Sequence, residues 1–392
     1  MNNIISFDEF IANKPLYYKE IDYTRIYKAY DVLEPFIKKP KIIHLIGTNG
    51  KGSTGRIIAS LLHYQNIKVG HFSSPHIIEF NERIWIDGKN ISNQELQKAH
   101  LKLYKILGKE ISDGLSYFEY TTLLSLVAME NLDIIVFEAG LGGEFDATSI
   151  VKKELSVVTP IGFDHQDFLG NTIKEIATTK LNSIEKKAII GIQSYDEVYS
   201  IAKEIAERKN AKLYILKEFS NLEENKKIES IIKNLGWGSY LYENALLAIN
   251  ALKLLELPYD LNDLSRVKLF GRFYPIRENV IIDVGHNLLA TEAISKALTQ
   301  KFGDKKIILI YNSLDDKDYI AILKKLKKHI KRVEIIQIDT KRALDIELLK
   351  SALKKLSIKF NLFKNINNDE NYLVFGSFYV VEAFIKKELL QI

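Results

Sequence analysis

The chain has 392 residues, 46% of them hydrophobic and 27% charged, and a formal net charge of +5 at pH 7. It has no cysteine, which excludes disulfides, thiol catalysis and cysteine-ligated zinc. This composition is that of a globular protein of two or three domains, and its modest charge, spread over lysines that alternate with acidic residues, does not indicate nucleic-acid binding.

Short apolar, β-branched runs alternate with helical periodicity along the whole chain, which predicts an α/β protein with mainly parallel sheets. In chain order, strands are expected at 41–46, 67–72, 133–138, 155–159, 187–191, 212–216, 279–284, 305–311, 333–338 and 371–375. Helices are expected at 53–65, 93–107, 117–130, 172–184, 196–208, 240–256, 288–301, 316–329, 344–355 and 377–390. Because the strand–helix rhythm restarts near 279, we expect a large domain at 1–275 and a smaller one at 276–392.

A glycine-rich loop follows the first expected strand. Residues 47–53 read Gly-Thr-Asn-Gly-Lys-Gly-Ser and lead into a helix. The glycines let backbone N–H groups approach an anion, Lys51 and the helix N-terminus supply positive charge, and Ser53 can ligate Mg²⁺. The spacing is not that of a Walker A loop, since Leu45 stands where that pattern has glycine and Gly52 where it has serine or threonine. We interpret the loop as a compressed phosphate loop; the alternative is a tight turn with a solvated lysine.

Acidic and histidine side chains follow two later strands. The strand 133–138 ends in Glu138, which in a phosphate-loop protein occupies the place of an Mg²⁺-binding carboxylate. The alternative is a carboxylate that caps a turn. The segment 159–170 holds Asp164, His165 and Asp167; His165 either ligates a metal or orients a phosphate, or is structural.

Two more segments are weaker candidates. In 72–83, Ser74 could reach a metal, and the polar, aromatic loop could receive an organic substrate. Near the domain junction, Arg272 precedes Asp283-Val-Gly-His286, which could clamp the phosphates and ribose of ATP; the alternative is a strand-end turn with Asn287 as helix N-cap.

Together these segments resemble the folylpolyglutamate synthase/dihydrofolate synthase family of the Mur ligase superfamily. The resemblance covers nearly the whole chain. It rests on nine motifs in the family's order: Gly47–Ser53, Ser74-Pro-His76 with Asn81–Ile84, Phe118–Thr122, Glu138–Gly143 with Asp146-Ala-Thr148, Gly162–His165 with Leu169-Gly170, Gly271-Arg272, Asp283–Asn287, Asp316–Asp318 and Phe375–Ser377.

The resemblance implies a P-loop-type N-terminal domain that binds ATP, a smaller Rossmann-like C-terminal glutamate-ligase domain, and ATP held between them. It implies two Mg²⁺ ions, one served by Ser53, Ser74 and Glu138, the other by Glu138, His165 and a modified Lys180. Lys51, His165 and Lys180 would be catalytic. ATP would contact Thr48, Asn49, Gly50, Lys51, Gly52, Ser53, Thr54, Arg272, Asp283 and His286. The pterin would contact Ser74, His76, Phe118, Asp146 and Ala147.

The chain departs from the family's usual pattern in three places. Glu144 stands where arginine is usual, which reverses the charge at this position. The residues around Lys180, Thr-Lys-Leu-Asn-Ser-Ile, differ from the usual Glu-Lys-Ala-Gly-Ile. Val284 and Leu288 replace glycine and proline, while Asp283, His286 and Asn287 remain.

The activity that the resemblance implies is ATP-dependent addition of L-glutamate to dihydropteroate and to folates through an acyl phosphate. Alternatives are a folylpolyglutamate synthase alone, a Mur-type cell-wall ligase and a non-enzymatic nucleotide switch. Cell-wall ligases carry an extra N-terminal domain for a UDP-sugar, and the roughly 40 residues before the phosphate loop are too few for such a domain. Expected partners are small molecules, with no nucleic acid and no membrane, since the first ten residues lack a signal-peptide pattern and no apolar run approaches the ~18 residues of a membrane span. We expect a cytoplasmic monomer.

Overall fold

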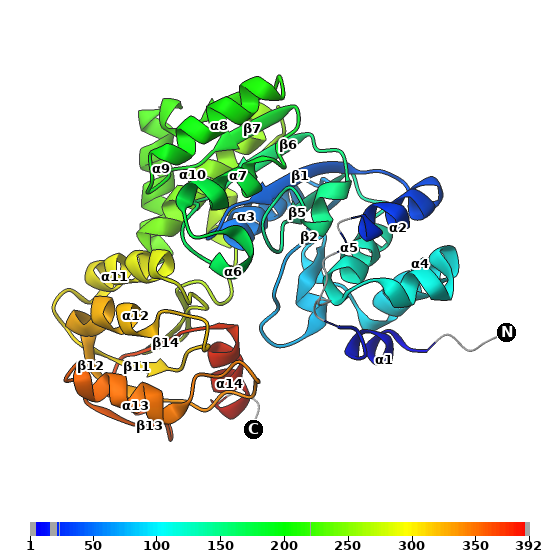
Figure 1. Ribbon diagram of the computed structural model, residues 1–392. Helices are drawn as coiled ribbons and strands as arrows, with labels where there is room; N and C mark the ends of the chain where they lie inside the picture. The colour runs from blue at the N-terminus through cyan, green and yellow to red at the C-terminus, as the bar shows by residue number, and fades with distance from the viewer. Residues whose placement is uncertain (1–4, 16–21, 23, 220, 389–392) are drawn as a thin grey trace. The chain divides into compact units, whose positions relative to one another are not determined.

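Two α/β units make up the chain, each built around its own sheet (Figure 1). The computed structural model describes residues 5–15, 22, 24–219 and 221–388. Unit 1 holds the described residues of Met1–Ser220 and Leu246–Asp263. Unit 2 holds Asn221–Ala245 and the described part of Leu264–Ile392. Each unit is therefore discontinuous in sequence.

The sheet of unit 1 has eight strands in the order β4-β3-β2-β5-β1-β6-β7-β8. The strands are β1 (Lys41–Ile46), β2 (Val69–Phe72), β3 (Ile84–Ile86), β4 (Lys89–Asn90), β5 (Ile134–Glu138), β6 (Leu155–Val158), β7 (Lys187–Ile190) and β8 (Lys212–Ile215). Neighbouring strands in the run β2-β5-β1-β6-β7-β8 are parallel, whereas β3 and β4 are added antiparallel at the edge beside β2. Because parallel strands end at one edge, the loops that follow β1, β5 and β6 meet there.

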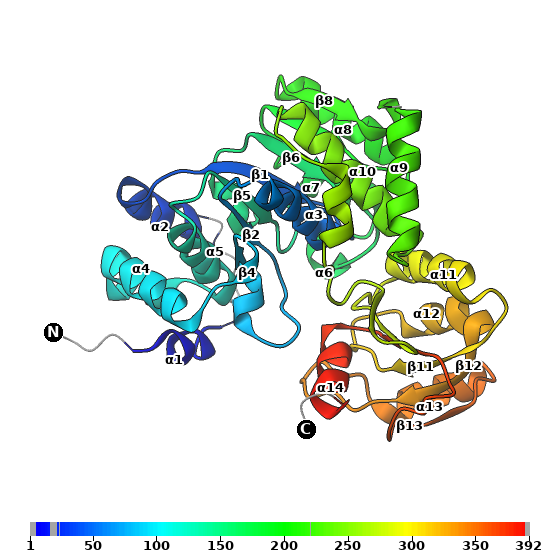
Figure 2. The same ribbon diagram turned by 180° about the vertical axis from the view of Figure 1, so that it is seen from behind.

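Helices cover both faces of this sheet. They are α1 (Phe7–Ala12), α2 (Arg25–Leu33), α3 (Lys51–Tyr64), α4 (Asn93–Gly114), α5 (Tyr117–Ala128), α6 (Gln166–Leu169), α7 (Ile173–Leu181), α8 (Glu197–Arg208) and the later part of α10 (Ser239–Leu254). The helix α3 packs against β1, β2 and β5 (Figure 2). On the other face, Ile42, Ile135 and Phe137 share a core with α4 and α5. Alternate residues of the buried strands therefore face the two layers, which is why the strands read as continuous apolar runs.

The sheet of unit 2 has six strands in the order β13-β12-β11-β14-β10-β9, all parallel except β9. They are β9 (Tyr274–Arg277), β10 (Val280–Ile282), β11 (Ile307–Tyr311), β12 (Ile330–Ile335), β13 (Phe360–Leu362) and β14 (Tyr372–Phe375). The helices are α9 (Leu222–Asn234), the start of α10, α11 (Leu288–Phe302), α12 (Tyr319–Leu326), α13 (Ile346–Lys355) and α14 (Phe378–Glu388).

The predicted fold class is confirmed: both sheets are mainly parallel, and the smaller unit, apart from residues 221–245, follows the larger phosphate-loop unit in sequence. The short elements β3, β4, β9, β13, α1, α2 and α6 were not anticipated, nor was the longer helix α9. The last two residues of the helix expected at 377–390 lie outside the described residues. The domain boundary at 275/276 stays a prediction; the two units divide the chain elsewhere and place α9 with the C-terminal strands. Among the described residues, no helix combines the length and apolarity that crossing a membrane requires.

Candidate functional site

The glycine-rich loop connects β1 directly to α3. Gly50 is the N-cap of α3 and has a left-handed backbone, with φ 89°. Gly47 has φ 141°, and a Cβ there would collide with Thr159, at 2.8 Å from its carbonyl oxygen. Both positions therefore require glycine, for conformation at Gly50 and for conformation and space at Gly47.

Part of this loop is tied to the segment after β6. The N–H groups of Thr48 and Asn49 donate to the carbonyl of Pro160, at 2.9 and 3.2 Å. The Thr48 hydroxyl donates to the carbonyl of Gly162 and accepts from its N–H, both at 3.1 Å. These two amides are thus engaged within the protein, and the N–H groups at the start of α3, which a helix leaves without internal acceptors, are the ones suited to an anion.

Two lysine amines converge on one carbonyl of the loop. Lys51 Nζ lies 3.3 Å from the Gly47 oxygen and 3.2 Å from that of Thr48. Lys180, on α7, is buried, and its Nζ donates to the same Gly47 oxygen at 3.1 Å. Burial, and to a lesser extent the positive charge of Lys51, lower the pKa of Lys180 to about 7, against a smaller opposing effect of Asp164 and Asp146. The fold thus brings two predicted catalytic residues together.

Two of the expected metal ligands belong to the ends of neighbouring strands: Ser53 follows β1, and Glu138 is the last residue of β5. Ser53 is buried at the first turn of α3, and its hydroxyl has no hydrogen-bond partner among the described residues. Glu138 is 5% exposed at the end of β5, next to Leu45 of β1. A buried hydroxyl and a strand-end carboxylate at one sheet edge are hard oxygen donors, the type that Mg²⁺ prefers, so the residues fit such an ion.

Ser74 and His165 lie on separate loops. Ser74 is half-buried after β2, and His165 is exposed as the N-cap of α6, with φ 52°. Among the described residues, no three His, Cys, Asp or Glu side chains are grouped so that they could hold a metal ion by themselves. The two expected metal sites also include serine side chains and a modified lysine, and they stay a prediction.

Asp146 and its neighbours form a hydrogen-bonded corner after β5. The buried Asp146 carboxylate accepts from the Leu141 N–H at 2.8 Å and from the N–H and hydroxyl of Thr148 at 2.9 and 2.5 Å. Burial raises the pKa of Asp146, and these hydrogen bonds oppose the rise. Ala147 is buried as the next residue of the chain.

The remaining expected pterin residues border the same segment or a separate loop. A Cβ on Gly140 would lie 2.5 Å from the Phe118 ring, so that ring lies directly against the loop that leads to Asp146. Phe118 also packs on Phe72, with ring centroids 6.0 Å apart. His76 is held by Arg83, whose Nε donates to Nδ1 at 2.8 Å. Asp146, Ala147 and Phe118 therefore belong to one corner, whereas His76 is fixed within its own loop.

In unit 2, the expected ATP-binding residues have clear structural partners. Asp283 is buried and accepts hydrogen bonds from the Tyr240 hydroxyl at 2.7 Å and from the N–H groups of Phe273 and Gly285, each at 2.8 Å. Burial raises its pKa, while Arg272 and these donors lower it. Asp283 therefore has a structural role, whether or not these residues also bind a nucleotide. Its partner Tyr240, more than 40 residues away in sequence, was not identified from the sequence.

Arg272 and His286 flank a second residue that the sequence did not reveal. The Arg272 guanidinium lies 5.2 Å from the centre of the Phe378 ring, and the His286 ring centre is 6.5 Å from it. His286 Nδ1 lies 3.0 Å from the carbonyl of Val284, which fixes the proton on Nδ1. Phe378 begins α14, directly after the motif Phe375–Ser377.

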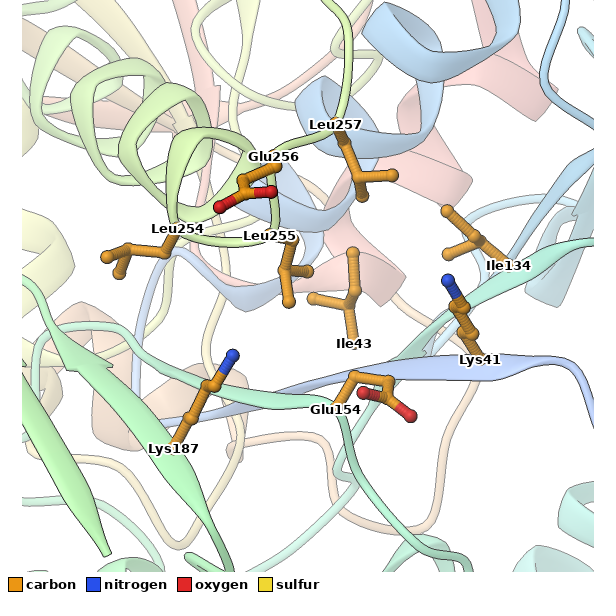
Figure 3. Close-up of a pocket in the computed structure, with 9 residues that line it drawn as sticks. All are labelled: Lys41, Ile43, Ile134, Glu154, Lys187, Leu254, Leu255, Glu256 and Leu257. Atoms are coloured by element: carbon orange, nitrogen blue, oxygen red, sulfur yellow. The ribbon is translucent and has the colours of Figure 1, made fainter.

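A separate cavity of about 230 Å³ lies at the opposite edge of the unit 1 sheet (Figure 3). It is lined by Lys41, Ile43, Ile134, Glu154, Lys187, Leu254, Leu255, Glu256 and Leu257. Most of these residues stand at or near the amino ends of strands, whereas ligands of parallel sheets bind beyond the carboxyl ends. The cavity is therefore distinct from the phosphate loop.

Comparisons with known proteins match most of the chain to Mur ligase domains. The Mur ligase middle domain family matches residues 46–252, and the Mur ligase glutamate ligase domain family matches 271–374. A Buchnera aphidicola (subspecies Schizaphis graminum) protein named dihydrofolate synthase/folylpolyglutamate synthase is 32% identical over 86% of each chain.

Solved structures agree. Helicobacter pylori folylpolyglutamate synthetase is 38% identical, with a TM-score of 0.78 over 97% of both chains. A bifunctional folylpolyglutamate synthase/dihydrofolate synthase solved with Mn, AMPPNP and L-glutamate is 26% identical, with a TM-score of 0.80 over 96% of this chain and 95% of that one.

Proposed function

Because the chain belongs to the dihydrofolate synthase/folylpolyglutamate synthase family of Mur ligases, we propose that it is an ATP-dependent ligase that adds L-glutamate to dihydropteroate and to reduced folates. The observation that carries this proposal is the phosphate loop with Lys51 and Lys180 converging at Gly47. A relative solved with AMPPNP and L-glutamate supports the same pair of ligands.

The reaction has two steps. An oxygen of the acceptor's carboxylate attacks the γ-phosphorus of ATP, the bond to the β-phosphate oxygen breaks, and ADP leaves. The amino group of glutamate then attacks the acyl carbon; the amide forms, phosphate leaves, and the amine loses a proton. Lys51 and the N–H groups at the start of α3 neutralise charge on the transferred phosphoryl group, so the protein acts by positioning and electrostatics.

The residues around the loop also fit divalent cations. Ser53, Ser74 and Glu138 would hold one Mg²⁺, and Glu138, His165 and Lys180 a second. Bound Mg²⁺ would supply positive charge beside the phosphates. The relative solved with Mn supports a metal requirement, and the number of ions is part of the proposal.

For Lys180 to ligate a cation its amine must be carboxylated, because an ammonium group repels Mg²⁺ whereas a carbamate offers two oxygens. Its burial and its position 3.1 Å from Gly47 O support this assignment, since they place it beside the loop rather than in solvent. Loss of activity in Lys180→Ala that a short carboxylate restores is the expected result. An unmodified Lys180 directed to solvent in an ATP–Mg complex would contradict it.

In unit 2, we propose that Arg272 and His286 contact the nucleotide, and that Asp283 holds their loop through Tyr240 and Phe273. The proposal further includes action in the cytoplasm and a monomeric state. Light scattering of the purified protein at assay concentration tests the latter.

Separate assays with each of the two acceptors, dihydropteroate and tetrahydrofolate, test the proposed function. With ATP, release of ADP should require dihydropteroate or tetrahydrofolate together with glutamate, and dihydropteroate should yield dihydrofolate. Turnover of tetrahydrofolate with none of dihydropteroate would leave only the folylpolyglutamate synthase activity, and ADP release independent of any acceptor would favour a nucleotide switch.

Asp146→Ala should lose the dihydropteroate reaction while its affinity for ATP stays largely unchanged. Ala147 leaves room for a pterin against the loop, and the Asp146 carboxylate accepts hydrogen bonds from a ring N–H or amino group. Kinetics with dihydropteroate and nucleotide binding by calorimetry measure the two effects separately. An equal loss of ATP affinity would mean that Asp146 has another role.

A further inference from the structure

His44 is a polar residue in the centre of an apolar strand. It lies in the middle of β1, beside Phe137 of β5 and Ser156 of β6, and is fully buried. On its own face of the strand, its neighbours are Ile42 and Ile46, both in apolar cores. Burying an imidazole in such surroundings is unfavourable unless its polar atoms are hydrogen-bonded.

One ring nitrogen has a specific partner. His44 Nε2 lies 2.8 Å from the hydroxyl oxygen of Thr148, and this hydroxyl lies 2.5 Å from Oδ1 of Asp146. Because a carboxylate only accepts, the threonine donates its proton to Asp146 and accepts from His44. The neutral ring therefore carries its proton on Nε2, and the three side chains form a relay that runs from the sheet to the carboxylate.

The relay determines which carboxylate oxygen remains for a ligand. Oδ1 of Asp146 accepts from both the hydroxyl and the N–H of Thr148, whereas Oδ2 accepts from the Leu141 N–H. With two lone pairs on each oxygen, Oδ1 is filled and Oδ2 has one position left. The carboxylate is thus held by three donors in one orientation, with Oδ2 as the atom for substrate.

We propose that His44 is a positioning residue for the acceptor substrate: through Thr148 it fixes the Asp146 carboxylate so that Oδ2 is directed to an N–H donor of a pterin-type ring. This inference rests on the proposed function and adds a residue to it.

Packing alone does not explain the histidine. Its other nitrogen, Nδ1, is buried and has no hydrogen-bond partner among the described residues. Leucine or isoleucine would fill the same interior without leaving a buried acceptor unsatisfied. His44 is unfavourable for packing, and its hydrogen bonds lead to the Asp146 carboxylate, which is proposed to contact the substrate. Both observations fit a functional constraint better than a structural one.

Four variants separate the relay from packing. His44→Leu removes the donor, and His44→Gln keeps an N–H near the position of Nε2. Thr148→Val removes the hydroxyl at nearly constant shape. His71→Leu is the matched control, because His71 is also a buried histidine of the same sheet. It lies in β2, which β5 separates from β1, and its ring nitrogens have no hydrogen-bond partners among the described residues. Steady-state KM and kcat for dihydropteroate and for ATP are measured beside thermal unfolding.

His44→Leu and Thr148→Val should each raise KM for dihydropteroate about 3- to 10-fold, the effect of one hydrogen bond, with KM for ATP changed less than about twofold. His44→Gln should recover most of this loss, and the double variant His44→Leu/Thr148→Val should be no worse than the more impaired single one, because both break one relay.

Equal impairment in His44→Gln and His44→Leu, additive effects in the double variant, or parallel rises in both KM values would overturn the relay. A similar rise for His71→Leu would assign the effect to packing. These outcomes are separate from failure of the proposed function, which wild-type protein alone reveals by turning over neither dihydropteroate nor tetrahydrofolate. Should His44→Leu not fold, the comparison of Thr148→Val with wild type carries the test.

Discussion

Lys51 and Lys180 share the Gly47 carbonyl as an acceptor, so two amines meet beside the phosphate loop. A bound triphosphate would offset this concentration of positive charge. Lys51→Ala should therefore lower kcat at least ~100-fold, the size of one strong electrostatic contact with the transferred phosphate, without loss of folding. Turnover and circular dichroism measure the two effects, and near-normal turnover would refute the phosphate-loop assignment.

Lys180 should make the ligand-free protein less stable than a variant with an apolar side chain. Its pKa is about 7 in the folded protein against 10.5 for an ordinary lysine, because burial disfavours the charged form. The folded state binds fewer protons than the unfolded chain between these values, so this residue makes stability rise with pH from about 7 to 10.5 and costs several kcal/mol at pH 7.

In CO₂-free buffer at pH 7, Lys180→Met should therefore raise Tm by roughly 5–10 °C and abolish activity. It should also flatten the pH dependence of stability above pH 7. Thermal unfolding at several pH values checks this. A variant less stable than wild type at pH 7 would mean that the Lys180–Gly47 hydrogen bond outweighs the desolvation of the amine.

Two residues that depart from the family's usual pattern contact each other. Asn182 donates to the Glu144 carboxylate at 2.8 Å and accepts from Arg208 at 2.6 Å. The arginine expected at position 144 could not accept this hydrogen bond. The reversed charge therefore joins the loop after β5 to the end of α7, next to Lys180, and gives the altered sequence around Lys180 a structural partner.

At the scale of elements, the loop after β5 supports α7 through a glycine. A Cβ on Gly143 would meet the backbone of Lys180, at 2.7 Å from its Cα, and the Glu144 N–H donates to Thr179 O at 2.9 Å. Gly143→Ala should push α7 and Lys180 away from Gly47, and we expect kcat to fall at least ~10-fold, since small displacements of catalytic groups are costly.

The matched control is Gly114→Ala, at the end of α4, where an added Cβ meets nothing within 4 Å. It should leave kcat and Tm within error of wild type. Crystal structures or exchange protection of α7 in both variants would locate the displacement. Unchanged kcat in Gly143→Ala would show that the position of Lys180 is not set by this contact.

The long elements around the phosphate loop could be predicted because their signals are local: β1 is an apolar run, and the glycines and α3 follow it directly. The strands β3 and β4 have only three and two residues, too short for alternation to be visible. The helix α9 lies in a polar, lysine-rich stretch and buries only Ile228 and Ile232.

Among the site residues too, those with a local sequence signal could be predicted and those with distant partners could not. Lys51 and Glu138 follow strands and were found by position, and Lys180 by its likeness to the family motif. Tyr240 and Phe378 were missed because their partners are distant in sequence, and contacts of that kind leave no local pattern. The one signal for His44 was a polar residue inside an apolar strand, which by itself does not distinguish a buried structural histidine from a functional one.

For the whole molecule, the division into units implies that residues 246–263 belong to the N-terminal unit although α9 comes before them. Leu247, Ile249 and Leu252 are each at most 1% exposed. Burying each contributes about 1.5–3 kcal/mol, so together they rival the ~5–15 kcal/mol by which a domain is stable. Residues 1–220 alone should unfold at clearly lower urea concentration than residues 1–263, as followed by circular dichroism. Equal midpoints would show that the segment adds little.

The interleaving of the two units also orders events during synthesis. The chain leaves the first unit at 220, returns to it at 246 and leaves it again at 263. A ribosome must therefore release α9, which belongs to the later unit, before the earlier one has its last segment. At about 5–20 residues per second, the nascent protein spends seconds with an incomplete first unit, and the apolar side chains that α10 covers stay open to chaperones during that interval.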